Sequence, residues 1–334
     1  MTISISVICP VHNRKRLIGE TLASLSRQTL PPHEIIVVDD ASDDGTPDEI
    51  AANWPSVRLL RSYRNRGPGA ARNLGLAAAT GTHVIFFDSD DLATDDYLAA
   101  RAEVAREAKA DIVYGPWTPV WLDDAVCRHD GFVRQRRPPK VPPLDAFLRG
   151  WVLFVPLCLI RRELVLDAGG YPEHMWTGED MLLLFRMLAR SPRVAHTARS
   201  LMLVRQHPAD QISAGYRETH RRLREDLALC DLVGAELAAL NAVGPDLRRA
   251  WRIRRAASQI RARRQGIDVA DIESDPLIMA QARVAALTQR LQHAVTARLF
   301  GHRLHRHFSP GPLDAETVAI IERLGYEARR AHGS

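Results

Sequence analysis

The sequence predicts an α/β fold in which a mainly parallel sheet with flanking helices is followed by a mainly α-helical C-terminal region. Apolar strand patterns alternate with helical patterns over the first 115 residues, and strands separated by crossover helices form parallel sheets. Polar clusters follow three of these strands, where open α/β sheets bind their ligands. From about residue 216 the sequence is helical in character.

The N-terminal elements follow each other in a regular order. Runs of β-branched and apolar residues predict strands, and apolar residues at helical spacing predict helices. Thr46-Pro47 predicts an N-cap followed by proline at the first helical position. We expect strands at 3–9, 34–38, 57–60, 83–87 and 111–114, and helices at 17–25, from 46, at 70–79 and at 95–108.

Beyond this region the organisation changes. Residues 116–145 are rich in proline and arginine, which predicts an irregular connection. Helix breaks are expected at four Gly- or Pro-containing sites: Gly244-Pro245, Gly266, Asp275-Pro276 and Ser309 to Pro312. We therefore predict an α/β, ligand-binding domain over residues 1–215 and a helical, Arg-rich region over residues 216–334.

Composition excludes several classes of protein. Hydrophobic residues at 46% and charged residues at 25% are typical of a globular chain rather than a disordered one. The longest apolar run, 151–160, is half the length of a membrane span. The four cysteines form no C-x-x-C pair, which argues against a zinc knuckle or a disulfide framework. Without a signal-peptide pattern, the expected location is the cytoplasm.

The carboxylates Asp88, Asp90 and Asp91 directly follow an apolar strand. Crowded carboxylates repel one another, and a divalent cation removes that cost. Hard oxygen ligands suit Mg²⁺ or Mn²⁺. The alternative is an acidic turn that caps the next helix, with Thr94 or Asp95 as the N-cap.

Two further clusters lie at predicted strand ends or helix starts. Asp40 follows the second strand, where it could accept a hydrogen bond from a nucleobase or only shape a turn. Residues 65–73, NRGPGAARN, lead a glycine-bearing loop into a helix, and helix N-termini attract anions. Arg72 within this segment could bind a phosphate with two hydrogen bonds. An ordinary turn with a surface arginine is the alternative.

Glu179 and Asp180 follow Thr177-Gly178, one of which is expected to start a helix. A carboxylate there could act as a general base, or only be favoured by the helix dipole. His207 could ligate a metal or be structural. The histidines at 293, 302, 305 and 307 have spacing that could hold zinc, but the arginines between them disfavour a cation.

Taken in order, the segments ICPVHN, VVDDASDDGT, NRGPGAARNLGL, FFDSDD, GGYPEHMWTGED and RQH resemble the family 2 glycosyltransferases of GT-A fold. The resemblance covers about residues 2–210. It implies an enzyme that transfers a sugar from a nucleotide-diphosphate sugar to a hydroxyl acceptor with inversion, assisted by Mn²⁺ or Mg²⁺. A UDP-sugar is the favoured donor. The QxxRW motif of processive synthases is absent, since Gln206 is followed by His-Pro, so transfer of a single sugar is expected.

The resemblance also implies roles for individual residues. Asp180 would be the catalytic base, with Glu179 as its partner. Asp90 and His207 would contact the metal. His12 stands where many members carry a tyrosine that stacks on the base. The resemblance therefore does not identify which nucleotide the donor carries. The donor-binding residues implied by position are Pro10, His12, Asn13, Asp40, Arg72, Asp88 and Ser89.

Two other hypotheses about function are compatible with the sequence. A nucleotidyltransferase also uses carboxylate-held metal, but releases pyrophosphate from a nucleoside triphosphate. Residues 248–264 hold eight arginines and no acid, which suits an anionic surface such as a membrane. Few aromatic residues lie among them, which disfavours nucleic acid. The alternative is a solvated helix whose arginines pair with acids such as Asp268, Asp271 and Glu273. The helical C-terminal region is also compatible with assembly of the protein into a homo-oligomer.

Overall fold

The computed structural model divides into two compact units. Described residues within Met1–Gln135, Leu153–His207 and Ser309–Ser334 form the first, and those within Arg136–Val152 and Pro208–Phe308 form the second. The boundary at residue 215 stays a prediction. The structure describes residues 2–123, 126–129, 132–135, 140–151, 153–206, 220–240, 243–287, 308–311, 318, 322 and 327–330.

The first unit is built on a central sheet with the strand order β11-β6-β10-β4-β1-β2-β3. Strand β10 is antiparallel to its neighbours β4 and β6, and the other pairs are parallel. The mainly parallel sheet predicted from the sequence is therefore confirmed. The strands are β1 (Ile5–Val11), β2 (Glu34–Asp40), β3 (Arg58–Ser62), β4 (His83–Phe86), β6 (Ile112–Tyr114), β10 (Leu159–Arg161) and β11 (Val194–His196).

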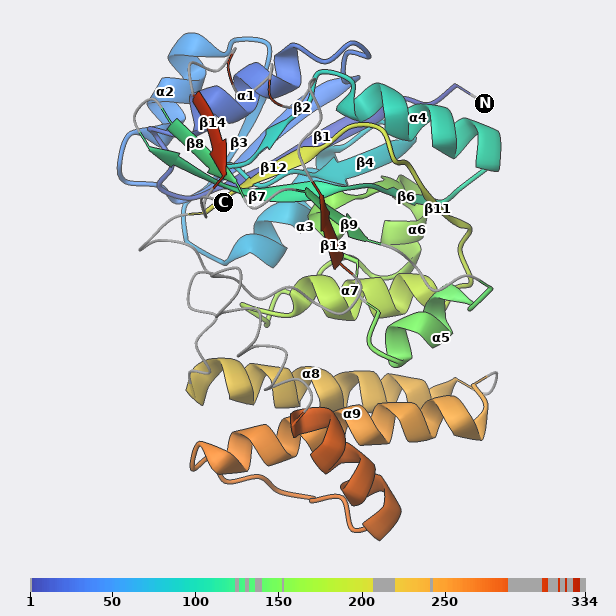
Figure 1. Ribbon diagram of the computed structural model, residues 1–334. Coiled ribbons are helices and arrows are strands. Elements are labelled where there is room, and N and C mark those ends of the chain that lie inside the picture. Colours follow the sequence, from blue (N-terminus) through green and yellow to red (C-terminus); the bar gives the residue numbers. More distant parts are fainter. Residues whose placement is uncertain are drawn as a thin grey trace. The chain divides into compact units, whose positions relative to one another are not determined.

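Helices cover both faces of this sheet. Figure 1 shows α1 and α4 on one face and α3, α6 and α7 on the other. The helices of this unit are α1 (Ile18–Ser26), α2 (Thr46–Asn53), α3 (Pro68–Ala78), α4 (Tyr97–Ala108), α6 (Arg162–Asp167) and α7 (Glu179–Leu188), with a 3-10 turn, η1, at Val155–Leu157. The N-cap of α2 is Gly45 rather than Thr46, and the Thr46 N–H donates a hydrogen bond to the Asp44 carboxylate at 2.9 Å.

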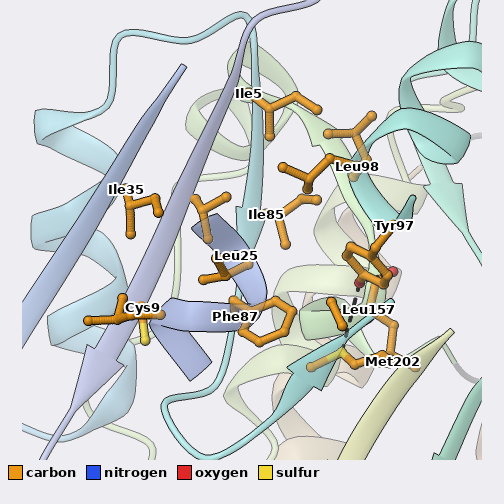
Figure 2. Close-up of a cluster of buried hydrophobic side chains, with 14 of the residues drawn as sticks. Ile5, Cys9, Leu25, Ile35, Ile85, Phe87, Tyr97, Leu98, Leu157 and Met202 are labelled. Atoms are coloured by element: carbon orange, nitrogen blue, oxygen red, sulfur yellow. Dashed lines mark hydrogen bonds between the residues drawn. The ribbon is translucent and has the colours of Figure 1, made fainter. Parts of the chain in front are cut away.

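The alternation of β1 assigns its side chains to the two faces. Val7 and Cys9 point into the cluster under α1 and α4, where Figure 2 shows Leu25, Phe87 and Tyr97 packed together. Burial of such apolar side chains is the main favourable contribution to folding. On the opposite face α3 approaches β1 closely. A Cβ on Gly75 of α3 would lie 2.3 Å from Ile8 Cγ2, so only glycine permits this packing.

The prediction of an irregular connection over residues 116–145 is wrong. This stretch contains three strands and a short helix, and the strands join a second sheet ordered β13-β9-β7-β12-β5, with β8 paired to β7 and β14 to β8. Strand β7 pairs in parallel with β12, about 85 residues later, so no local pattern reveals it. The elements are β5 (Leu92–Ala93), β7 (Trp117–Asp123), β8 (Val126–His129), β9 (Phe132–Gln135), β12 (Met202–Arg205), β13 (Phe308–Gly311), β14 (Glu327–Arg330) and α5 (Pro143–Leu148).

The second unit contains α5, α8 (His220–Ala239), α9 (Pro245–Arg264) and a helix over residues 276–287. The expected breaks before α9, at Gly266 and before Pro276 are confirmed. Trp251 of α9 is 2% exposed, stacks on Phe147 of α5 and donates a hydrogen bond from Nε1 to the Cys230 carbonyl of α8 at 3.0 Å. One indole thus connects three helices.

Several arginines of α9 are engaged within this unit. Arg252 pairs with Glu273 at 2.8 Å, and Arg255 pairs with Asp231 at 2.5 Å. Arg248 donates to three backbone carbonyls at or just after the C-terminal end of α8: those of Leu237, Leu240 and Val243. Positive charge is favoured at a helix C-terminus. The alternative in which α9 is a solvated helix paired with nearby acids therefore gains direct support.

Within the described ranges, no helix has both the length and the apolar character to cross a bilayer. All four cysteines are buried and free.

Candidate active site

The carboxyl ends of β1, β2 and β4 lie next to one another. In the register of the sheet Val11 is opposite Asp39, and Ile8 is opposite Phe86. The polar residues that follow these three strands are therefore at one edge of the sheet, as the sequence predicts. These residues are the polar clusters of the sequence, at 10–13, 39–45 and 88–91. They lie at the ends of the three strands and in the turns that follow.

Arg72, on the first turns of α3, is the central cation at this edge. Its Nη2 donates to Asp88 Oδ1 at 2.9 Å, and its Nη1 donates to Glu179 Oε1 at 3.1 Å. The residue is 7% exposed, and its guanidinium lies 5.2 Å from the centre of the Tyr171 ring. Although burial alone would lower it, the two carboxylates raise the pKa of Arg72. Arg72 therefore stays charged and holds two acids from distant segments together.

The three carboxylates after β4 differ in their surroundings. Asp91 is 3% exposed and accepts the Arg205 backbone N–H at 2.9 Å. Asp90 pairs with Arg14 at 3.4 Å, and Asp88 with Arg72. Burial raises the pKa of Asp88 and of Asp91, and the charge of Asp90 raises both further. The crowding of negative charge inferred from the sequence is present.

Sequence reasoning missed Arg205, which holds the acidic turn from the other side. Its Nε donates to the Asp90 carbonyl at 2.9 Å, and its Nη2 pairs with Glu20 of α1 at 2.6 Å. Arg205 is brought here by the antiparallel pairing of β12 with β5. Its only signal in the sequence is its place as the first residue of the RQH segment.

Asp40 orders the loop before α3. Its carboxylate accepts the backbone N–H groups of Arg66, at 3.0 and 3.1 Å, and of Gly67, at 2.8 Å. It is 4% exposed. Asp40 therefore has a structural task in addition to the base contact that the resemblance implies, and a carboxylate has about four lone-pair sites with which to do both.

The remaining donor-side residues surround the ends of β1 and β4. Pro10 is half-buried at the end of β1, and His12 is exposed just beyond it. Asn13 connects the first two loops, because its N–H donates to Ser42 Oγ at 2.9 Å and its Oδ1 accepts the Asp43 N–H at 3.0 Å. Ser89 is 7% exposed, and its carbonyl accepts a hydrogen bond from Thr21 at 3.1 Å.

Glu179 and Asp180 form the first turn of α7, whose N-cap is Gly178 in the left-handed conformation at φ 79°. Glu179 is 8% exposed, and burial together with the neighbouring Asp180 raises its pKa to about 7 despite Arg72. Burial also raises the pKa of Asp180. Among the described residues Asp180 forms no ion pair, whereas Glu179 is held by Arg72. Asp180 is thus the less restrained of the two carboxylates.

The oxygen donors after β4 fit a hard divalent cation. Mg²⁺ needs only one or two carboxylates when substrate phosphates supply other ligands. Within the described part of the chain, no group of three or more His, Cys, Asp or Glu side chains has metal-holding geometry. His207 and the histidines at 293, 302, 305 and 307 lie outside the described residues.

Comparison with known sequences finds a family-model match over part of the chain. Residues 6–166 match the model described as Glycosyl transferase family 2. Succinoglycan biosynthesis protein ExoO of Rhizobium meliloti (strain 1021) is 34% identical over 200 residues, 57% of this chain and 57% of that protein. Poly(ribitol-phosphate) beta-N-acetylglucosaminyltransferase TarS of Staphylococcus aureus (strain Mu50 / ATCC 700699) is 27% identical over 208 residues, 57% of this chain and 33% of that protein. The chain thus spans less than two thirds of either relative.

Comparison with solved structures supports the fold. The structure of S. aureus TarS 1-349 in complex with UDP-GlcNAc has a TM-score of 0.60 at 20% identity, covering 89% of this chain and 85% of that one. Mannosyltransferase PcManGT from Pyrobaculum calidifontis, in complex with GDP-Man and Mn²⁺, has a TM-score of 0.52 at 22% identity, covering 97% and 80%. The fold is therefore that of the GT-A glycosyltransferases. Within this fold, residues 6–166 carry the similarity to glycosyltransferase family 2.

Proposed function

We propose that this protein is an inverting glycosyltransferase that moves one sugar from a nucleotide-diphosphate sugar to a hydroxyl acceptor, in the biosynthesis of a cell-surface polysaccharide, a glycoconjugate or a natural product. The observation that carries the proposal is the position of Arg72 between Asp88 and Glu179. Arg72 joins Asp88, which is expected to bind the donor, to the helix that carries the expected base. A transferase needs these two groups at a fixed separation, because the acceptor oxygen must meet the anomeric carbon in line.

The donor would lie along the edge formed by β1, β2 and β4. Pro10, exposed His12 and Asn13 would contact the nucleobase, with Asp40 accepting from it. Asp88 and Ser89 would face the ribose, and Arg72 the diphosphate. A UDP-sugar is the favoured donor, and the likeness to TarS, whose structure holds UDP-GlcNAc, supports this choice.

Asp90 would hold Mn²⁺ or Mg²⁺, with His207 as a second contact. The ion, when bound, would offset the charge that develops on the leaving diphosphate. The oxygen-rich turn after β4 and the likeness to PcManGT, whose structure holds Mn²⁺, support this assignment.

Asp180 would accept the proton from the acceptor hydroxyl as that oxygen attacks the anomeric carbon. Its raised pKa brings its basicity closer to neutral pH, which favours proton transfer. Glu179, held by Arg72, would keep the first turn of α7 in place. Displacement in a single step from the face opposite the diphosphate inverts the anomeric configuration. Four buried, free cysteines suit the reducing cytoplasm as the place of action.

The test is a thermal-shift screen of UDP, GDP and CDP and of their sugars, each with and without Mn²⁺. We expect one nucleoside diphosphate to raise the melting temperature only when the ion is present. Donor turnover should then release that nucleoside diphosphate, and NMR of the product should show the inverted anomer. Stabilisation by a nucleoside triphosphate alone, with release of pyrophosphate, would instead identify a nucleotidyltransferase.

A further inference from the structure

Asn73 makes a two-point contact with the loop that leads to α7. Its Oδ1 accepts the Tyr171 backbone N–H at 2.8 Å, and its Nδ2 donates to the Tyr171 carbonyl at 2.9 Å. The same Nδ2 donates to Glu173 Oε1 at 3.0 Å. A side-chain amide that pairs with both backbone groups of one residue fixes that residue in position and in orientation.

The surrounding contacts allow this loop little freedom. Gly170 has φ 67°, and a Cβ there would lie 2.6 Å from Asn73 Oδ1. A Cβ on Gly69 would lie 3.3 Å from the Pro172 carbonyl. Glu173 is also bound by Arg66, at 2.5 Å. The backbone of residues 170–173 thus packs against the first turns of α3. The contact depends on the small glycines at positions 69 and 170 and on the paired hydrogen bonds of Asn73.

Tyr171 connects the loop at residues 170–173 to Arg72 and its ion pairs. Its ring is 2% exposed, meets Phe86 edge-on at 5.0 Å and lies beneath the Arg72 guanidinium. Arg72 in turn binds Glu179, eight residues after Tyr171. Arg72 and Asn73 are neighbours on one helix. One turn of α3 therefore holds both ends of the segment that runs from residue 171 to the carboxylates of α7.

We infer that Asn73 is a positioning residue for the catalytic base. It fixes the loop at residues 171–173 against α3, so that Asp180 keeps its distance from the donor-holding edge. Asn73 itself touches neither substrate nor the reacting atoms. This inference rests on the proposed function, because positioning has a kinetic meaning only if Asp180 acts on the acceptor.

The first experiment tests whether Asn73 holds this loop, and it needs no measurement of enzyme activity. Asn73→Ala and Asn73→Asp are compared with Leu74→Ala, a matched control on the next residue of α3, whose side chain is 42% exposed. Amide hydrogen exchange at Tyr171 should accelerate at least tenfold in Asn73→Ala and stay unchanged in Leu74→Ala. Asn73→Asp can still accept the Tyr171 N–H but cannot donate, so its exchange should be intermediate. Unchanged exchange in Asn73→Ala overturns the inference.

The second experiment separates kcat from KM at a temperature where every variant is folded. Asn73→Ala should lower kcat by at least tenfold while KM and Kd for the donor stay within about twofold, since misplacement by about 1 Å can cost 10²-fold. A purely structural role would instead lower the melting temperature and leave kcat unchanged at this temperature, which overturns the inference. If the wild type releases no nucleoside diphosphate from any donor, the proposed function fails. The hydrogen-exchange result alone still reports whether Asn73 holds the loop at residues 171–173.

Discussion

Arg72 and Glu179 form a buried ion pair across 107 positions of sequence, with 3.1 Å between Nη1 and Oε1. Their side chains are 8% and 10% exposed. Neither charge would be stable alone at this depth, because the desolvation of an unpaired charge is not compensated. The pair fixes α7 against α3 at the edge of the sheet where the polar strand ends meet.

Replacing one partner of this pair should destabilise the protein more than replacing both. Above pH 7, where Glu179 is ionised, Arg72→Met leaves this carboxylate buried without its cation, and breaking such a pair typically costs about 3–5 kcal/mol in the free energy of unfolding. Arg72→Met combined with Glu179→Gln should recover part of that loss. Urea denaturation of the wild type, both single variants and the double variant gives the coupling. Additive effects of the two substitutions would show that the pair does not act as a unit.

The stability of the protein should depend on the ionisation of Glu179. Its pKa is about 7 in the folded state and about 4.5 when exposed, because burial disfavours the charged form. The folded state therefore keeps a proton that the unfolded state has lost between these values. The resulting stabilisation is complete below pH 4.5 and is lost as the pH rises through 7, by up to about 1.4 kcal/mol per pH unit.

Glu179→Gln isolates this effect from the other buried carboxylates. The difference in unfolding free energy between variant and wild type, measured by urea denaturation from pH 4.5 to 7.5, should move in favour of the variant as the pH rises. Asp180 and Arg72 face the same group, and both remain in the variant. A difference that stays constant with pH would mean that Glu179 is ionised in the folded protein throughout this range.

Asp180→Asn should lower turnover far more than donor binding. General-base catalysis is typically worth about 10²–10⁴-fold, and asparagine cannot accept the proton. Donor affinity should hardly change, because other residues are expected to bind the donor. Turnover, donor Kd and melting temperature are measured on the same variant. Near-normal turnover with a loss of about 0.3–1 kcal/mol in stability would leave Asp180 as a charge favoured only by the helix dipole.

Asp90→Asn should nearly abolish transfer without unfolding the protein. The contact with Arg14 is long, at 3.4 Å, and the amide oxygen of asparagine can still accept this hydrogen bond. Removing the charge also relieves repulsion of Asp88 and Asp91, so the melting temperature without metal should stay level or rise. Activity is followed against Mn²⁺ concentration. Wild-type turnover that survives EDTA would remove metal assistance from the mechanism.

Local patterns in the sequence determine much of this fold. The alternation of Ile5, Val7 and Cys9, and the apolar spacing of α1, arise from the fixed geometry of strands and helices, so they can be read without a structure. The turns after β1, β2 and β4 are equally visible, because parallel strands bring their carboxyl ends to one edge. The four early strand–helix pairs were predictable to within a few residues for this reason.

The tertiary structure decided which groups meet. The second sheet pairs β7 with β12 across about 85 residues, and no periodicity records a partner at that distance. Asn73 could equally have been a surface residue of α3, and the arginines of α9 could equally have faced solvent. Their partners, such as Tyr171 and Glu273, are set by packing of whole elements. Hydrophobic periodicity is a local property of the chain, whereas an ion pair or an amide contact requires two distant surfaces to be fixed first.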